Sequence, residues 1–137
     1  MALYGSRSTT MAMQHDEDPA AVIRKAVGDL SKFRIMGNQV LVGVYMRPEK
    51  TKSGILLADT TRGEDAHQGK ACLVLLKGQK AFISDNNYDF GDDDVKPGDW
   101  VAIFVSDGRK LVVNGWLCRL IEDTHIRIKI PSPDCVY

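Results

Sequence analysis

From Phe33 onward, short apolar runs alternate with turn-forming residues, and this alternation restricts the fold more than any other feature of the chain. Four runs rich in branched and aromatic residues cover positions 38–48, 69–78, 97–115 and 116–131. Such residues favour strands, whereas the glycine, proline and aspartate between them favour turns. No stretch between the runs has the period of a helix. We therefore expect an all-β fold of several short strands, either a small barrel or a sandwich.

Two details of the expected strands are more specific. The run at 97–115 contains Asp107-Gly108, a dipeptide suited to a tight turn, and we predict two strands joined there as a hairpin. In the last run isoleucine alternates with polar residues, so one strand face is expected to be apolar. The apolar face comprises Ile126, Ile128 and Ile130, and the polar face comprises His125, Arg127 and Lys129.

The N-terminal part of the chain has a different character. Residues 1–15 are small, polar and without period, which is typical of an arm. A short helix is predicted next, because Asp18 can cap the first free amides and Pro19 suits the first helical position. Its apolar residues fall at helical spacing, as expected of a stripe that packs on its own domain or on a neighbouring subunit: Val22, Ile23, Ala26, Val27 and Leu30. We therefore divide the chain into an arm with a helix (residues 1–32) and a β domain (residues 33–137).

Charge and hydropathy argue against several functions. The chain has 18 basic and 18 acidic side chains, and neither sign forms a long block, which argues against binding to nucleic acid or to a membrane surface. No apolar run approaches the roughly 20 residues that span a bilayer. The first residues lack the charged start and apolar core of a secretory signal, so we expect a cytoplasmic protein.

No metal site or catalytic site is predicted. The acidic stretch at 85–96 has the oxygen spacing of a calcium loop, but Phe90 stands where such a loop requires glycine and Lys96 where it requires glutamate. The three histidines are scattered, and none has the spacing of a catalytic pair: His15, His67 and His125. A glycine-rich phosphate cradle is not visible either. We therefore expect a protein that is not an enzyme and that uses no cofactor.

The three cysteines are widely spaced and form no zinc motif. One interpretation is that all three are reduced thiols, with Cys72 and Cys118 buried in strands and Cys135 in the tail. The other interpretation is that Cys135 links subunits of an assembly through a disulfide.

Four stretches, in their order and spacing, resemble the chaperonin-10 family, the GroES-like co-chaperonins. The resemblance spans residues 33–130, and its most distinctive parts are the loop at 54–57 and the turn at 95–99. The four stretches are TKSGILL at 51–57, GKACLVLLKG at 69–78, DVKPGDWVAIF at 94–104 and CRLIEDTHIRIKI at 118–130.

The resemblance implies a GroES-like small β-barrel that assembles as a seven-membered ring. It also implies a mobile loop at 51–68 that docks on the apical domains of a GroEL-like chaperonin, which would itself bind and hydrolyse ATP. The contact residues would be Gly54, Ile55, Leu56 and Leu57. The segment at 77–94 would be a roof hairpin that covers the folding chamber and turns its acidic side chains toward a solvent-filled dome. These acids are Asp85, Asp89, Asp92, Asp93 and Asp94.

The physical properties of the apolar triplet Ile55, Leu56 and Leu57 are compatible with this role. Burial of three aliphatic side chains yields roughly 5–8 kcal/mol. Ordering a loop costs about 1–2 kcal/mol per residue, so a single loop binds weakly and several copies on a ring bind firmly. The alternative, in which the triplet ends a strand buried in its own barrel, stays open at this point.

The chain also departs from ordinary co-chaperonins. About 32 residues precede the β domain, and the tail PSPDCVY follows the last strand. This divergence resembles the co-chaperonins of tailed bacteriophages. It raises a second hypothesis: a virion structural protein with the same fold that decorates or cements a phage capsid by binding the major capsid protein.

Overall fold

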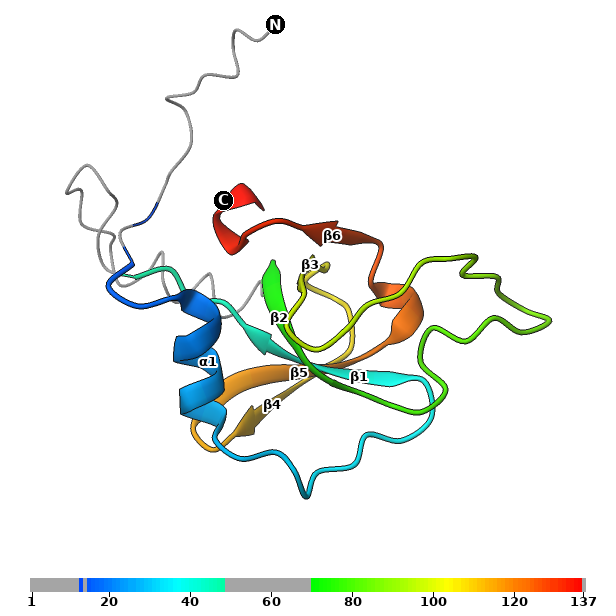
Figure 1. Ribbon diagram of the computed structural model, residues 1–137, viewed down its shortest axis with the longest axis horizontal. Helices are drawn as coiled ribbons and strands as arrows, with labels where there is room; N and C mark the ends of the chain where they lie inside the picture. The colour runs from blue at the N-terminus through cyan, green and yellow to red at the C-terminus, as the bar shows by residue number, and fades with distance from the viewer. Residues whose placement is uncertain (1–12, 14, 49–69, 137) are drawn as a thin grey trace, which may run out of the picture.

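The computed structural model describes residue 13 and residues 15–48 and 70–136, and these form one antiparallel sheet with one α-helix (Figure 1). The sheet has six strands in the order β4-β5-β1-β2-β3-β6. The elements are α1 (Pro19–Val27), β1 (Gln39–Val44), β2 (Ala71–Lys77), β3 (Trp100–Ala102), β4 (Arg109–Val113), β5 (Trp116–Glu122) and β6 (Ile128–Ile130), with 3-10 turns η2 (Asp123–His125) and η3 (Pro133–Val136). The prediction of a small all-β fold with a short N-terminal helix is confirmed. No helix in the described ranges is long and apolar enough to cross a bilayer.

One face of the sheet carries the larger apolar core. Side chains alternate between faces along a strand, so Val40, Val42 and Val44 of β1 point to the same side. They pack with Val101 of β3 and with apolar residues of β2 and β5. The segment at 78–98, drawn in green to yellow in Figure 1, contributes Ala81 and Val95 to this core.

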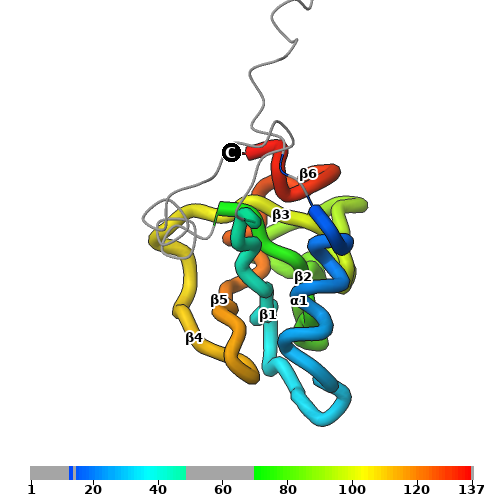
Figure 2. The backbone as a smooth tube through the Cα atoms, turned by 90° about the vertical axis from the view of Figure 1, so that its left-hand side faces the viewer, coloured from blue at the N-terminus to red at the C-terminus, as the bar shows by residue number. Residues whose placement is uncertain are grey.

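Helix α1 covers the opposite face of the sheet, beside β1 and β2 (Figure 2). Ile23 and Val27 are each 1% exposed and pack against Leu41 of β1 and Leu73 of β2. The helix comes very close to β1 at Gly43, where an added Cβ would lie 2.6 Å from Cγ2 of Ile23. The apolar stripe thus packs on its own domain.

The start of α1 differs from the prediction in one respect. Pro19 occupies the first turn as expected, but the Asp18 side chain makes no capping hydrogen bond. Instead the Asp18 carbonyl accepts a hydrogen bond from the amide of Val22. The Asp18 carbonyl is thus the first acceptor of the helix, and the carboxylate takes no part in the cap.

The predicted hairpin at Asp107-Gly108 is wrong. Strand β3 pairs with β2 and β6, whereas β4 pairs with β5, so the strands on either side of this dipeptide are not neighbours. The tight turn lies at Asn114-Gly115, where both residues have positive φ (50° and 89°) between the paired Val113 and Trp116. At Asp107 the carboxylate accepts a hydrogen bond from the Phe104 amide, which closes an irregular loop instead of a hairpin.

The predicted apolar face of the last run is confirmed in part. Ile130 is buried and Ile126 packs against the main core, but Ile128 is 54% exposed. The reason is the position of β6 at the edge of the sheet, with β3 as its neighbour. Strand β1 ends at Val44, before the end of the apolar run at 38–48.

Candidate partner-binding site

The predicted contact residues Gly54, Ile55, Leu56 and Leu57, and the rest of the loop at 51–68, lie outside the described residues. The structure describes the base of this loop, where the chain leaves β1 and later enters β2. These two strands are antiparallel neighbours, with Val44 opposite Cys72, and the Tyr45 amide donates to the Ala71 carbonyl over 2.9 Å. The end of β1 and the start of β2 therefore lie side by side at one end of the sheet.

A polar cluster lies at this base and joins three distant parts of the chain. The Tyr45 hydroxyl donates to Oδ1 of Asp134 over 2.6 Å. Nε2 of His15 lies 3.1 Å from Oδ2 of Asp134 and 3.2 Å from the Tyr45 hydroxyl. The Tyr45 ring is 2% exposed and meets the Trp100 ring edge-on, with centroids 5.9 Å apart. We call His15, Tyr45 and Asp134 the clasp.

Further hydrogen bonds hold the backbone near the clasp. Nε1 of Trp116 donates to the Val44 carbonyl over 2.9 Å, and the Ile103 amide donates to the Lys70 carbonyl over 3.0 Å. A cavity of about 340 Å³ opens between the start of α1 and the base of the loop. Its lining combines the apolar Met46 and Pro48 with polar side chains from residues 15–17, which precede α1, so it is an amphipathic hollow beside the base of the loop.

Within the predicted roof segment at 77–94, only Lys77, the last residue of β2, lies in a strand, and the acidic residues mostly shape turns. Oδ1 of Asp85 accepts hydrogen bonds from the amides of Asn87 and Tyr88. Oδ1 of Asp89 accepts from the Ser84 hydroxyl and the Gly91 amide, and these bonds lower the pKa of the Asp89 carboxyl. Aspartate commonly forms turns in this way, because its carboxylate accepts from amides two or three residues further on.

The three remaining acids of this segment lie toward β6. Nζ of Lys77 donates to Oδ1 of Asp94 over 2.9 Å, and this bond lowers the pKa of the Asp94 carboxyl. Asp92 and Asp93 line a cavity of about 840 Å³ between the segment and β6, together with aromatic and charged side chains. Within the described ranges, no three His, Cys, Asp or Glu residues are grouped so that they could hold a metal ion.

The thiols fall into two groups. Burial raises the pKa of the Cys72 thiol to about 12 and that of the Cys118 thiol to about 11. Cys135 is exposed, with Sγ 3.3 Å from the Ser132 hydroxyl. Two buried strand cysteines and an exposed one in the tail are as predicted, and the intersubunit disulfide of Cys135 stays a prediction.

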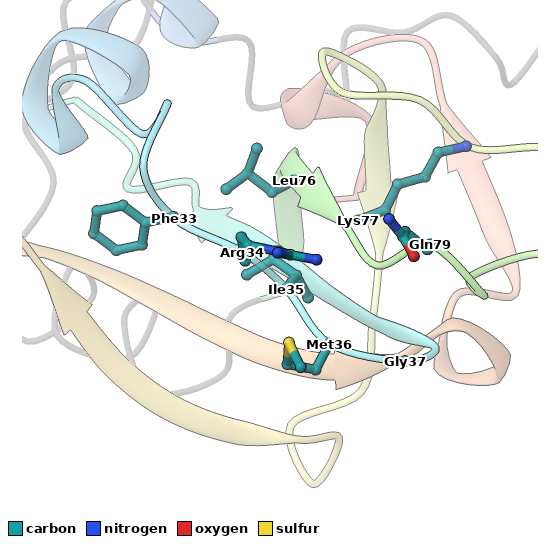
Figure 3. A pocket seen from close by; sticks show the side chains of 8 residues that line it. All are labelled: Phe33, Arg34, Ile35, Met36, Gly37, Leu76, Lys77 and Gln79. Carbon is teal, nitrogen blue, oxygen red and sulfur yellow. The ribbon is translucent and has the colours of Figure 1, made fainter.

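A second surface feature lies where the chain enters β1 (Figure 3). A cavity of about 250 Å³ separates the residues before β1 from the end of β2. Phe33 and Met36 are 44% and 70% exposed there, and Figure 3 shows their side chains on the same stretch of chain as Arg34 and Ile35. Both side chains line this cavity, so the surface beside it is partly apolar.

Sequence reasoning missed the clasp. His15 was noted only as one of three scattered histidines, and Tyr45 and Asp134 were assigned no role. Asp134 lies 119 residues from His15 and 89 from Tyr45. No local pattern connects positions so far apart, so only the tertiary structure brings them together.

Comparison with known proteins identifies a relative. The chain matches no protein-family profile. It is 34% identical over 80 residues to the co-chaperonin GroES of Halothermothrix orenii, and the aligned part covers 58% of this chain and 77% of the relative. This similarity gives no support to the bacteriophage-like assignment or to the capsid hypothesis.

Proposed function

The chain belongs to the GroES family of co-chaperonins, and on that premise we propose that it is a ring-shaped lid that closes the folding chamber of a chaperonin. The single observation that carries the proposal is the similarity to a co-chaperonin over 77% of the length of that relative. The chain would act in the cytoplasm as a binding protein, while ATP hydrolysis belongs to the chaperonin.

The partner contact in this proposal is the apolar triplet Ile55, Leu56 and Leu57, with Gly54 before it. Support comes from the base of the loop, because β1 before it and β2 after it are adjacent antiparallel strands. One such loop binds weakly, and a ring that presents several copies converts the later contacts into intramolecular ones. A lid that must leave the chamber in each cycle needs this combination of weak single contacts and firm collective binding.

The proposed assembly is a homo-oligomer with seven subunits. The exposed Phe33 and Met36 and the half-exposed Ile128 on the edge strand β6 are the apolar groups that subunit contacts would cover. In the ring, Asp92 and Asp93 would face the chamber from the roof. Cys135 is exposed, so a disulfide to a second copy is sterically open to it.

The test of the lid proposal is substitution of the triplet. We expect Ile55→Asp and Leu56→Asp to abolish chaperonin binding, since each removes about 1.5–3 kcal/mol of burial per loop and places a charge in an apolar contact. The measurements are the inhibition of the chaperonin's ATPase and the refolding of a substrate that requires the lid. Circular dichroism should show an unchanged fold.

The matched control is Ile83→Asp, because Ile83 is also an exposed isoleucine (60%) and lies far along the chain from the triplet. This variant should bind as the wild type does. Chaperonin binding by Ile55→Asp at the wild-type level would contradict the proposal.

A further inference from the structure

We propose that the clasp of His15, Tyr45 and Asp134 fixes the base of the partner-binding loop and thereby sets how tightly the lid holds its chaperonin. The effect on chaperonin affinity rests on the proposed function, whereas the clasp itself is a feature of the described structure. Tyr45 is thus a positioning residue, which acts through the loop that follows it and does not touch the partner.

The clasp uses both oxygens of one carboxylate. Oδ1 of Asp134 accepts the short hydrogen bond of 2.6 Å from the Tyr45 hydroxyl, and Oδ2 lies 3.1 Å from Nε2 of His15. The side chains of His15 and Asp134 are only 21% and 22% exposed, and Tyr45 is buried. Hydrogen bonds to a charged group in a largely enclosed place are stronger than those between neutral groups.

The clasp lies where it can control the loop. Tyr45 is the first residue after β1, and its amide bonds to Ala71, the first residue of β2. The hydroxyl of the same residue is tied to η3 through Asp134 and to the residues before α1 through His15. Met13, close to His15 in the sequence, is fully buried, so the chain is also held down on the N-terminal side of the clasp.

A fixed base affects binding through entropy. A loop whose base is fixed has fewer conformations to lose when it docks. The entropy cost of ordering the loop is then smaller, and more of the contact energy remains as binding free energy. In a ring, each loop that binds has the same smaller entropy cost. The affinity of the whole ring therefore changes more than the affinity of one loop. The clasp therefore adjusts affinity without contributing a contact.

The decisive variant is Tyr45→Phe, which removes the hydroxyl and keeps the ring that packs on Trp100. We expect the affinity of the folded lid for a purified chaperonin to fall by about tenfold, measured well below the unfolding temperature so that loss of fold does not contribute. The matched control is Tyr88→Phe, since Tyr88 is 50% exposed and lies in the 78–98 segment. Equal affinity of wild type and Tyr45→Phe would overturn the inference.

A second measurement needs no chaperonin. Hydrogen exchange of the residue 45 amide, which bonds to the Ala71 carbonyl, should speed up by about tenfold in Tyr45→Phe while amides in the middle of β1 and β5 keep their rates. If the wild type shows no chaperonin binding but the exchange accelerates, the lid proposal fails and the clasp stands. If exchange at residue 45 is unchanged, the clasp is overturned whatever the chaperonin does.

A double substitution separates positioning from general destabilisation. In the clasp, Tyr45 and Asp134 act as one unit, so Tyr45→Phe combined with Asp134→Asn should weaken binding no more than the stronger single change. If the affinity loss of the double variant equals the product of the two single losses, the two substitutions act independently. That result would contradict the inference.

Discussion

At the scale of single residues, the side chain with the most unexpected role is Arg119. It is 1% exposed although it carries a charge, and it lies on β5 among apolar neighbours. Its Nη1 donates to the carbonyls of Phe104, Val105 and Asp107 over 3.3, 2.8 and 3.1 Å. A buried guanidinium needs such acceptors, because an uncompensated buried charge is very costly. The loop between β3 and β4 therefore supplies the acceptors for Arg119, at the place where a hairpin was expected.

The cysteines permit a prediction at the same scale. Because burial raises the thiol pKa values of Cys72 and Cys118, both stay protonated and shielded at about pH 8, whereas Cys135 is exposed. A disulfide-exchange reagent at that pH should label one thiol per native chain and all three after denaturation. Labelling of Cys72 in the native protein would contradict the structure.

The same thiols make stability fall at alkaline pH. The folded pKa of Cys72, about 12, lies above its ordinary value of 9.0, so the unfolded chain releases a proton at lower pH than the native chain. The stabilising contribution is complete below about pH 9 and is lost as the pH rises toward about 12. The free energy of unfolding in urea should therefore fall more steeply between about pH 9 and 12 for the wild type than for Cys72→Ala. Below about pH 9 the two proteins should show the same dependence on pH.

At the scale of elements, α1 shows how an extension becomes part of the fold. The sequence predicts the helix and its apolar stripe, and the structure places Ile23 and Val27 against the sheet. The docking position depends on Gly43, which has no side chain to hold the helix away from β1. A glycine within a strand often marks such a close approach.

We expect Ile23→Ala to reduce the free energy of unfolding by about 2–5 kcal/mol, because it leaves a cavity between α1 and the sheet. Chemical denaturation monitored by tryptophan fluorescence gives this value. Lys25→Ala serves as the control, since Lys25 is exposed and its ion pair with Glu17 contributes little. An Ile23→Ala variant as stable as the control would show that the helix does not stabilise the sheet.

At the scale of the whole molecule, the proposed ring would cover two exposed apolar residues. Met36 is 70% exposed beside the cavity before β1, and Ile128 lies half-exposed on the edge strand β6. A monomer would leave these groups in water. In the proposed ring, contacts between subunits would bury both side chains.

If the proposed ring forms through Met36, we expect Met36→Asp to shift the assembly toward smaller species, because the substitution would place a charge in the proposed apolar subunit contact. Sedimentation velocity with reductant measures the mass of the assembly, and the same run without reductant shows whether Cys135 adds a covalent link. Ile83→Asp is the control, as an exposed apolar residue of the 78–98 segment. A wild type that sediments as a monomer at all concentrations would contradict the ring.

The sequence by itself determined the elements whose signals are local. Periodicity identified the stripe of α1 and most of the strands, and composition placed Cys72 and Cys118 inside, because each of these features depends on residues a few positions apart. The apolar triplet at 55–57 was also found from sequence, and its role stays a prediction.

Only the tertiary structure decided which strands pair and which polar groups meet. Asp107-Gly108 and Asn114-Gly115 are both good turn signals, but only the second joins paired strands, whereas the carbonyl groups of the loop at the first accept hydrogen bonds from the distant Arg119. The clasp likewise depends on contacts between residues as much as 119 positions apart. Such contacts are set by how the whole chain closes on its core, and this information is not contained in any single stretch of the sequence.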